Sequence, residues 1–234
     1  MQPTNPFQAS LQIFTKPNGV FEAANNNNNW SWIPFILVMS FVLLPIYLYY
    51  NFVDFEWYRD FIVNSTAGNL SPAEQNNIRA QIKPDFLVTG MLIVAFLFQV
   101  IINLILAAYL NLVAKTDDEC INGFTDWYGF TWWVSLPSVI GFIAALISLT
   151  LAENNQISIG QLNPLALSYW LSLDEGSKWY GLANLIKPEL FFSIYLIAVG
   201  LSRWTKFNSS KIYTIAIAPF AIIIVLWFFL LLMK

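Results

Sequence analysis

Long uncharged apolar runs separated by polar connections dominate the chain. No Asp, Glu, Lys or Arg lies between the members of four pairs: Glu22 and Asp54, Asp85 and Lys115, Asp126 and Glu153, and Lys211 and Lys234. A shorter charge-free run extends from Glu189 to Arg203. A bilayer hydrocarbon core about 30 Å thick requires about 20 apolar helical residues to cross it. The pattern therefore predicts an integral membrane protein with several spanning helices.

The expected fold is all-α, a polytopic bundle of five transmembrane helices with short interfacial helices. Residues 1–29 would form an N-terminal arm and residues 30–234 a five-span membrane domain. Spans are predicted at about 32–50, 86–114, 127–151, 188–204 and 212–233. Tryptophan and arginine often anchor helix ends at a membrane interface. We expect such anchors at Trp30, Trp32, Trp57, Arg203 and Trp204.

The segments outside the spans carry weaker signals. Phe7, Leu11 and Phe14 recur at helical spacing, which is typical of a short helix on the membrane surface. A mostly disordered tail is the alternative, and the asparagine run at 25–29 is expected to be a linker. Residues 54–61 predict another surface helix, and Ser71 is expected to cap a helix together with Glu74. The amides of residues 154–173 predict an irregular loop or a half-buried hairpin, because unpaired polar groups are costly in lipid.

Composition supports a membrane location and excludes several kinds of chemistry. Of the 234 residues, 57% are hydrophobic and 11% are charged, whereas a soluble domain carries about 25% charged residues. Histidine is absent, which removes Ser-His-Asp triads and the commonest metal ligand. Cys120 is the only cysteine, so an intrachain disulfide and a cysteine zinc site are excluded. The net charge of −3 gives no reason to expect a nucleic acid partner.

Three amides lie at membrane depth in the second predicted span. Gln99 and Asn103 share one helical face, and Asn111 follows two turns later. Such amides could bond to a neighbouring helix and hold the bundle together. They could alternatively line a polar path for a small solute.

Small residues form one face of two later spans. Such faces let helices approach closely, and their members are Ser138, Gly141, Ala145 and Ser148 in the third span and Thr214, Ala218 and Ala221 in the fifth. The spacing leaves open whether these faces pack within one chain or form a homo-oligomer. Pro137 is expected to kink the third span near one end, and broken helices are also a transporter feature.

Acidic residues between the second and third spans are the remaining candidates for chemistry, namely Asp117, Asp118, Glu119 and Asp126. Carboxylates can hold a hard cation, but these lack an EF-hand spacing, and a solvated charge run is the simpler interpretation. The sequence has no phosphate-binding glycine loop and no catalytic H-E-x-x-H or nucleophile-elbow motif. We therefore expect no metal site, no cofactor and no catalytic residue.

Short motifs recur in a characteristic order over nearly the whole chain. They are Phe14-Thr-Lys-Pro17 with Val20-Phe21, Asp54-Phe-Glu-Trp57, Ser71-Pro-Ala-Glu-Gln75, Ser135-Leu-Pro137, Leu162-Asn-Pro-Leu165 and Gly200-Leu-Ser-Arg-Trp204. In this order the chain resembles the bacterial branch of the Yip family, the Ypt/Rab-interacting membrane proteins with five spans.

The resemblance implies a cytoplasmic N-terminus and a C-terminus outside, in a bacterial inner membrane. The basic cluster from Arg203 to Lys211 favours the same orientation. Eukaryotic members are linked to small GTPases, but this sequence lacks the D-L-Y-G-P signature, so GTPase binding is not carried over. Together these features predict a non-enzymatic interaction or scaffold protein that binds lipids, other membrane proteins or a second copy of itself. A small-solute channel or transporter is the alternative.

Overall fold

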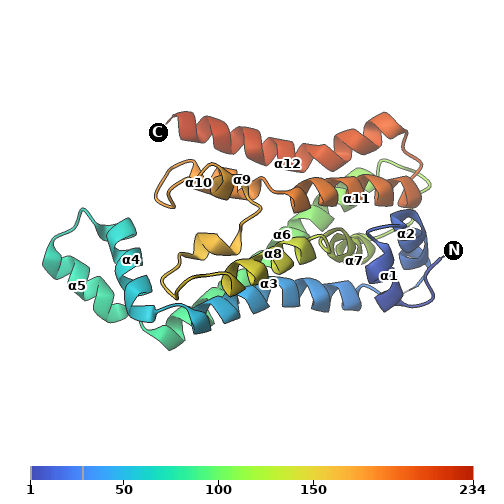
Figure 1. Ribbon diagram of the computed structural model, residues 1–234. Helices are drawn as coiled ribbons and strands as arrows, with labels where there is room; N and C mark the ends of the chain where they lie inside the picture. Colours follow the sequence, from blue (N-terminus) through green and yellow to red (C-terminus); the bar gives the residue numbers. More distant parts are fainter. Residues whose placement is uncertain (1, 28, 234) are drawn as a thin grey trace. The chain divides into compact units, whose positions relative to one another are not determined.

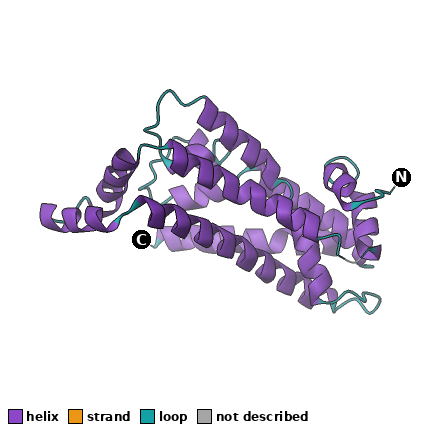
Figure 2. Cartoon of the chain, turned by 90° about the horizontal axis from the view of Figure 1, so that it is seen from below, coloured by secondary structure: helices purple, strands orange, loops and turns teal. Residues whose placement is uncertain are grey.

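The computed structural model describes residues 2–27 and 29–233, and these form helices joined by turns and loops (Figure 2). In chain order the elements are α1 (Pro6–Gln12), α2 (Pro17–Asn26), α3 (Trp32–Phe52), α4 (Phe55–Ala67), α5 (Pro72–Gln81), α6 (Pro84–Ala114), α7 (Phe124–Val134), α8 (Ser138–Thr150), the 3₁₀ turn η1 (Ile159–Leu162), α9 (Leu167–Trp170), α10 (Tyr180–Leu185), α11 (Pro188–Trp204) and α12 (Ser209–Leu232) (Figure 1). The all-α fold class predicted from the sequence is confirmed.

Four segments of the described chain are long and apolar enough to cross a membrane. They are α3, α6, the α7–α8 segment Phe124–Thr150, and α12, and they contain between 21 and 31 residues. The chain is therefore a polytopic integral membrane protein. The expected fourth span, α11, has only 17 residues. At a rise of 1.5 Å per residue these cover about 25 Å, less than a hydrocarbon core of about 30 Å, so the predicted count of five exceeds the structural count by one.

Local sequence explains where several helices begin and end. Ser71 accepts a hydrogen bond from the backbone N–H of Glu74 while the Glu74 carboxylate accepts from Ser71, so the predicted capping box of α5 is confirmed. Asn208 caps α12 by accepting from the N–H of Lys211 at 2.9 Å. Pro137 lies between α7 and α8, and the expected kink is an interruption of the helix at residues 135–137. Proline interrupts the helix because it lacks an N–H and its ring clashes with the preceding turn.

The chain divides into two compact units. Unit 1 comprises Met1–Ser40, Phe98–Val139 and Pro188–Lys234, and unit 2 comprises Phe41–Leu97 and Ile140–Lys187. Within unit 1, α2 lies beside α11, and α11 also packs against α7 and α12 (Figure 1). Within unit 2, α4 packs against α5, and α9 packs against α10.

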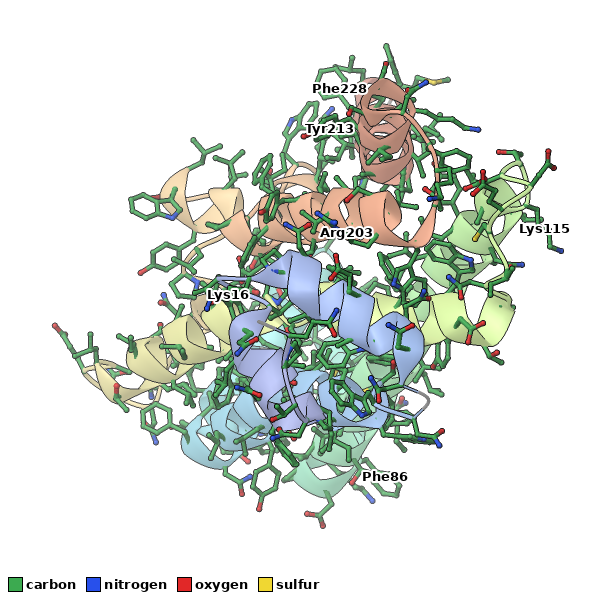
Figure 3. All side chains as sticks on the ribbon, turned by 90° about the vertical axis from the view of Figure 1, so that its right-hand side faces the viewer. Lys16, Phe86, Lys115, Arg203, Tyr213 and Phe228 are labelled. Atoms are coloured by element: carbon green, nitrogen blue, oxygen red, sulfur yellow. The ribbon has the colours of Figure 1, made fainter. Side chains whose placement is uncertain are left out.

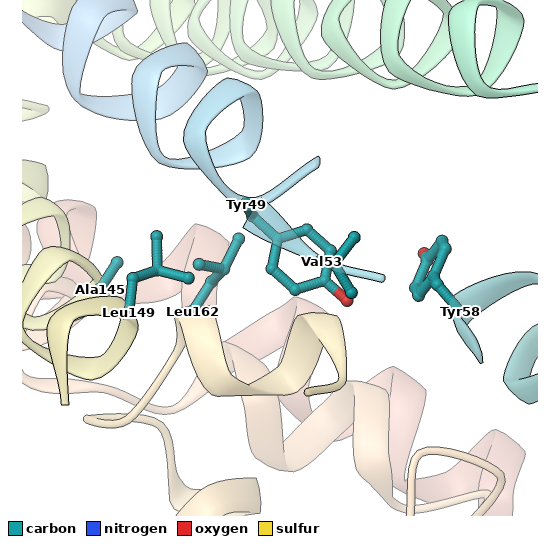
Figure 4. Close-up of a cluster of buried hydrophobic side chains, with 6 residues drawn as sticks. All are labelled: Tyr49, Val53, Tyr58, Ala145, Leu149 and Leu162. Carbon is teal, nitrogen blue, oxygen red and sulfur yellow. The ribbon is translucent and has the colours of Figure 1, made fainter. Parts of the chain in front are cut away.

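Each unit has a hydrophobic core of its own. The core of unit 2 gathers side chains from α3, α4, α8 and η1 with the residue that follows α3, namely Tyr49, Val53, Tyr58, Ala145, Leu149 and Leu162 (Figure 4). The buried Tyr49 hydroxyl donates to the carbonyl of Ile157 at 2.9 Å, so its polar group is satisfied. The core of unit 1 is dominated by aromatic side chains of α2, α7 and α11, including the fully buried Phe21, Trp127 and Phe130.

Candidate functional site

The N-terminal arm is folded onto unit 1 through a cluster of side chains that we call the arm junction: Phe21 and Glu22 of α2, Phe130 of α7, and Arg203 and Trp204 of α11. Of the two interpretations of the arm, the structure agrees with the helical one, because both α1 and α2 are formed. Pro17 starts α2, and the same helix face buries Val20, Phe21 and Ala23. Whether α1 also lies on a membrane surface stays a prediction.

Aromatic rings form the centre of the arm junction. The ring centroids of Phe21 and Phe130 are 5.0 Å apart, and those of Phe130 and Trp204 are also 5.0 Å apart. The ring centroid of Trp127 lies 5.2 Å from that of Phe130 and 5.2 Å from that of Trp204. Pairs of this geometry contribute about 0.5–1.5 kcal/mol each beyond the area that they bury. Gly200 gives the Phe130 ring its space, since a Cβ there would lie 2.5 Å from Phe130 Cζ.

Polar contacts at the edge of the arm junction fix the position of α2 along α11. Trp204 Nε1 donates to the carbonyl of Phe21 at 2.9 Å. Arg203, which Figure 3 labels on α11, donates from Nε to Asn18 Oδ1 at 2.9 Å and from Nη1 to Glu22 Oε1 at 3.1 Å. The Arg203 and Glu22 side chains are 40% and 38% exposed, and an ion pair so exposed contributes at most about 1 kcal/mol. Aromatic burial therefore holds the arm, and the ion pair sets its register.

The predicted interfacial anchors have different environments. Trp204 is buried and Arg203 contacts the arm. The sequence predicted that these two side chains contact lipid headgroups, whereas in the structure they hold α2. Trp32 is 62% exposed, while Trp30 and Trp57 are half-buried. For these three residues an anchoring role stays a prediction.

The three intramembrane amides belong to the part of α6 in unit 1. Asn103 is buried, and its Oδ1 lies 3.1 Å from the Ser135 hydroxyl that follows α7, whereas its Nδ2 has no partner. Gln99 and Asn111 are half-buried. Two residues before Asn111, the Tyr109 hydroxyl donates to the carbonyl of Ile215 in α12 at 3.0 Å. Polar groups of α6 therefore bond to neighbouring segments, as expected of side chains that hold helices together.

The predicted small-residue faces are only partly covered. Ala145 is buried in the core of unit 2, which makes it an intrachain contact (Figure 4). Gly141 and Ser148 are half-buried, and the Ser138 Oγ is buried without a partner. Within α12, Ala218 and Ala221 are half-buried, while Thr214 is exposed and donates to the carbonyl of Ser210. A role of these positions in an oligomer stays a prediction.

Acidic residues after α6 accept hydrogen bonds from backbone N–H groups of their own loop and of the connection between α11 and α12. Asp117 Oδ2 accepts from the N–H of Lys206 at 2.6 Å, and its Oδ1 accepts from the N–H of Glu119. Asp126 Oδ2 accepts from the N–H of Gly123 at 2.8 Å and so caps α7. Across residues 2–27 and 29–233, no three acidic or cysteine side chains gather closely enough to hold a metal ion.

Sequence reasoning missed the arm junction, although its residues stood in the motifs already noted. Phe21 closes one motif near the N-terminus, and Gly200, Arg203 and Trp204 belong to another near the C-terminus. The structure brings these two motifs into direct contact across 183 positions of the chain. The joint occurrence of the two motifs was the available signal of this contact. Neither motif contains a local feature that identifies the other as its partner.

Comparison with known families accounts for these motifs. A family model described as the Yip1 domain matches residues 11–230, which includes every residue of the arm junction. Comparisons with curated proteins and with solved structures found no match. Because the family match extends over nearly the whole chain, the protein belongs to the Yip1 domain family.

Proposed function

We propose that this protein is a non-enzymatic membrane-embedded interaction protein, and that its folded arm presents the surface that a partner contacts. One observation carries the proposal. Helix α1 buries Ala9 and the following Ile13 within the chain, yet Phe7 and Leu11 on the same helix are 63% and 76% exposed. A helix with apolar side chains on both its covered and its open face is typical of a surface that meets another protein or lipid.

The spanning helices support the same proposal. Only 11% of the most apolar stretch of α6 and 17% of that of α12 are buried within the chain. The remaining apolar surface requires lipid, another membrane protein or a second copy of this chain to cover it. Membership of the Yip1 domain family is compatible with this role.

Crosslinking in native membranes tests the proposal. A photoreactive residue at Phe7 or Leu11 should give adducts of defined mass with a membrane protein, a second copy of this chain or a lipid. A reactive residue at Ile121 is the matched control, because that apolar side chain is 94% exposed but lies outside the arm. These adducts identify the complexes that the protein forms. In protein without a reactive residue, the double variant Phe7→Gln with Leu11→Gln should lose those complexes, whereas Ile121→Gln keeps them. A monomeric protein whose arm forms no more adducts than Ile121 contradicts the proposal.

A small-solute pathway along α6 is the second candidate function. The unpartnered Nδ2 of buried Asn103 is the observation in its favour, since such a group is able to bind a passing polar solute. Flux through reconstituted protein should then fall in the double variant Gln99→Leu with Asn103→Leu. Unchanged flux in that variant removes this candidate.

We further propose a cytoplasmic N-terminus, a C-terminus outside and a bacterial inner membrane location. This orientation requires an odd number of crossings and therefore requires the short α11 to span the membrane. Arg203 lies in the last turn of that helix and has a long stem that can reach the headgroup region. Reporter tags at the two termini should report opposite compartments, and a shared compartment contradicts the orientation.

A further inference from the structure

Two adjoining cavities lie among the loops and short helices of unit 2. The first has a volume of about 510 Å³ and the second about 690 Å³. Gln161 and Tyr169 line both, so the cavities meet at these two residues. They differ in chemistry, because carboxylates and hydroxyls dominate the first, whereas the second has an apolar side and a polar side formed by Glu153, Asn154 and Gln156.

The first cavity is acidic and partly aromatic. Asp174 and Glu175 are the charged residues among the described side chains that line it, together with the rings of Phe61, Tyr169 and Tyr180. Glu175 Oε1 accepts from the N–H of Gly160 at 2.9 Å. A carboxylate has about four acceptor positions, so Glu175 retains capacity for a second donor.

Glu175 and Tyr180 converge on one point of this cavity. A Cβ on Gly160 would lie 2.7 Å from both Glu175 Oε1 and the Tyr180 hydroxyl. Burial, and then the negative charge of Glu175, raise the pKa of Tyr180, so its phenol remains neutral. Lys178 is the nearest cation along the chain, and its Nζ lies over the Trp179 ring at 5.5 Å from the centroid. Carboxylates beside aromatic rings favour an organic ammonium ion.

The second cavity offers a wall for a hydrocarbon chain. Its apolar side consists of Ala144 and Ile147 of α8 with the neighbouring Leu151, Leu165 and Trp170. Leu151 and Trp170 are 75% and 72% exposed, so this wall is open to an entering chain. Since α8 belongs to the membrane-crossing segment Phe124–Thr150, a lipid chain can reach this wall from the bilayer.

We propose that unit 2 binds an amphiphile whose headgroup carries an ammonium ion. The headgroup lies in the acidic cavity near Glu175, and the hydrocarbon chain follows α8 in the second cavity. The inference rests on the lipid-binding part of the proposed function and names a ligand class for it. A membrane aminophospholipid and a free alkylamine share this chemistry.

Titration of the full-length protein in a non-ionic detergent tests the site. Dodecylammonium should bind saturably by calorimetry, and dodecyl sulfate of the same chain length should bind at least about tenfold more weakly. The double variant Asp174→Asn with Glu175→Gln should weaken dodecylammonium binding by about tenfold, as expected when hydrogen bonds to charged groups are lost. Asp85→Asn is the control, because it removes an exposed carboxylate of unit 2 outside both cavities.

Glu175→Gln alone keeps the size of the side chain and its acceptor for Gly160, which protects the test against misfolding. Nanodiscs of aminophospholipid and of phosphatidylglycerol then distinguish the sources of the ligand. Selective retention of the aminophospholipid identifies a membrane lipid, and binding of dodecylammonium alone identifies a free amine. Equal affinity for ammonium and sulfate headgroups, or unchanged affinity in the double variant, overturns the proposal. Crosslinks from a reactive residue at Phe7, measured in the double variant Asp174→Asn with Glu175→Gln, test the proposed function separately from the ammonium site.

Discussion

Replacing Gly200 with alanine tests whether aromatic packing holds the arm on α11. The new Cβ would overlap the Phe130 ring and lie 3.1 Å from Cδ1 of Phe21. Both rings are fully buried, and Phe130 also contacts Trp127 and Trp204. Neither ring can move without displacing another aromatic side chain. Overpacking of this kind costs about 1–3 kcal/mol, and we expect a cost near the upper end, about 3 kcal/mol.

Gly90→Ala is the matched control for this variant. Gly90 lies inside α6, and a Cβ there meets no atom within 4 Å. Both variants gain the helix propensity of alanine, about 1 kcal/mol. The difference between their free energies of unfolding therefore measures the cost of the steric overlap at Gly200. A difference of about 3 kcal/mol corresponds to roughly 6–12 °C in Tm for a domain of this size.

Thermal unfolding of both variants in one detergent, at one scan rate, measures this difference. Limited proteolysis then reports whether α2 has been released, because an undocked arm exposes its backbone to the protease. Equal melting temperatures together with a protected arm in Gly200→Ala would refute the account of the arm junction.

Three further outcomes follow from single contacts. Trp204→Phe removes the hydrogen bond to the Phe21 carbonyl, costs about 1 kcal/mol, and should accelerate amide exchange in α2 about fivefold; unchanged exchange speaks against that bond. Ser71→Ala should cost α5 about 1 kcal/mol of local stability, visible as faster exchange over Pro72–Gln81 only. The backbone N–H of Trp57, then the Gln156 amide and the N–H of Glu56, lower the pKa of Asp54. The contribution of the Asp54 carboxylate to folding stability is therefore complete above the ordinary aspartate pKa of about 3.9 and is lost as the pH falls further. The stability of Asp54→Asn should consequently decrease less steeply on acidification.

Features that depend on local chemistry were predictable from the sequence. Charge-free runs located the long helices. Each segment that crosses a lipid core must satisfy its own backbone polar groups, so the signal lies within the segment itself. The Ser71 capping box was predictable because both of its partners lie within one turn. The interruption at Pro137 was foreseen as a kink, since the missing N–H is a property of that residue alone.

Features that depend on distant partners were not predictable. Arg203 and Trp204 have the pattern of interfacial anchors, yet they contact Glu22 and Phe21, which are 181 and 183 positions away. Local apolar spacing cannot identify which helix will cover a given face. The short α11 was predicted as a span from its uncharged run, and its 17 residues lie at the lower end of the lengths that cross a bilayer.

The arm junction has a consequence for how the chain is made. Phe21 leaves the ribosome long before Trp204, and 183 positions separate them. At synthesis rates of about 5–20 residues per second, the arm waits roughly 9–37 seconds for the helix that covers it. Its apolar face is unprotected during that interval, so biogenesis of this protein requires a temporary cover for the arm.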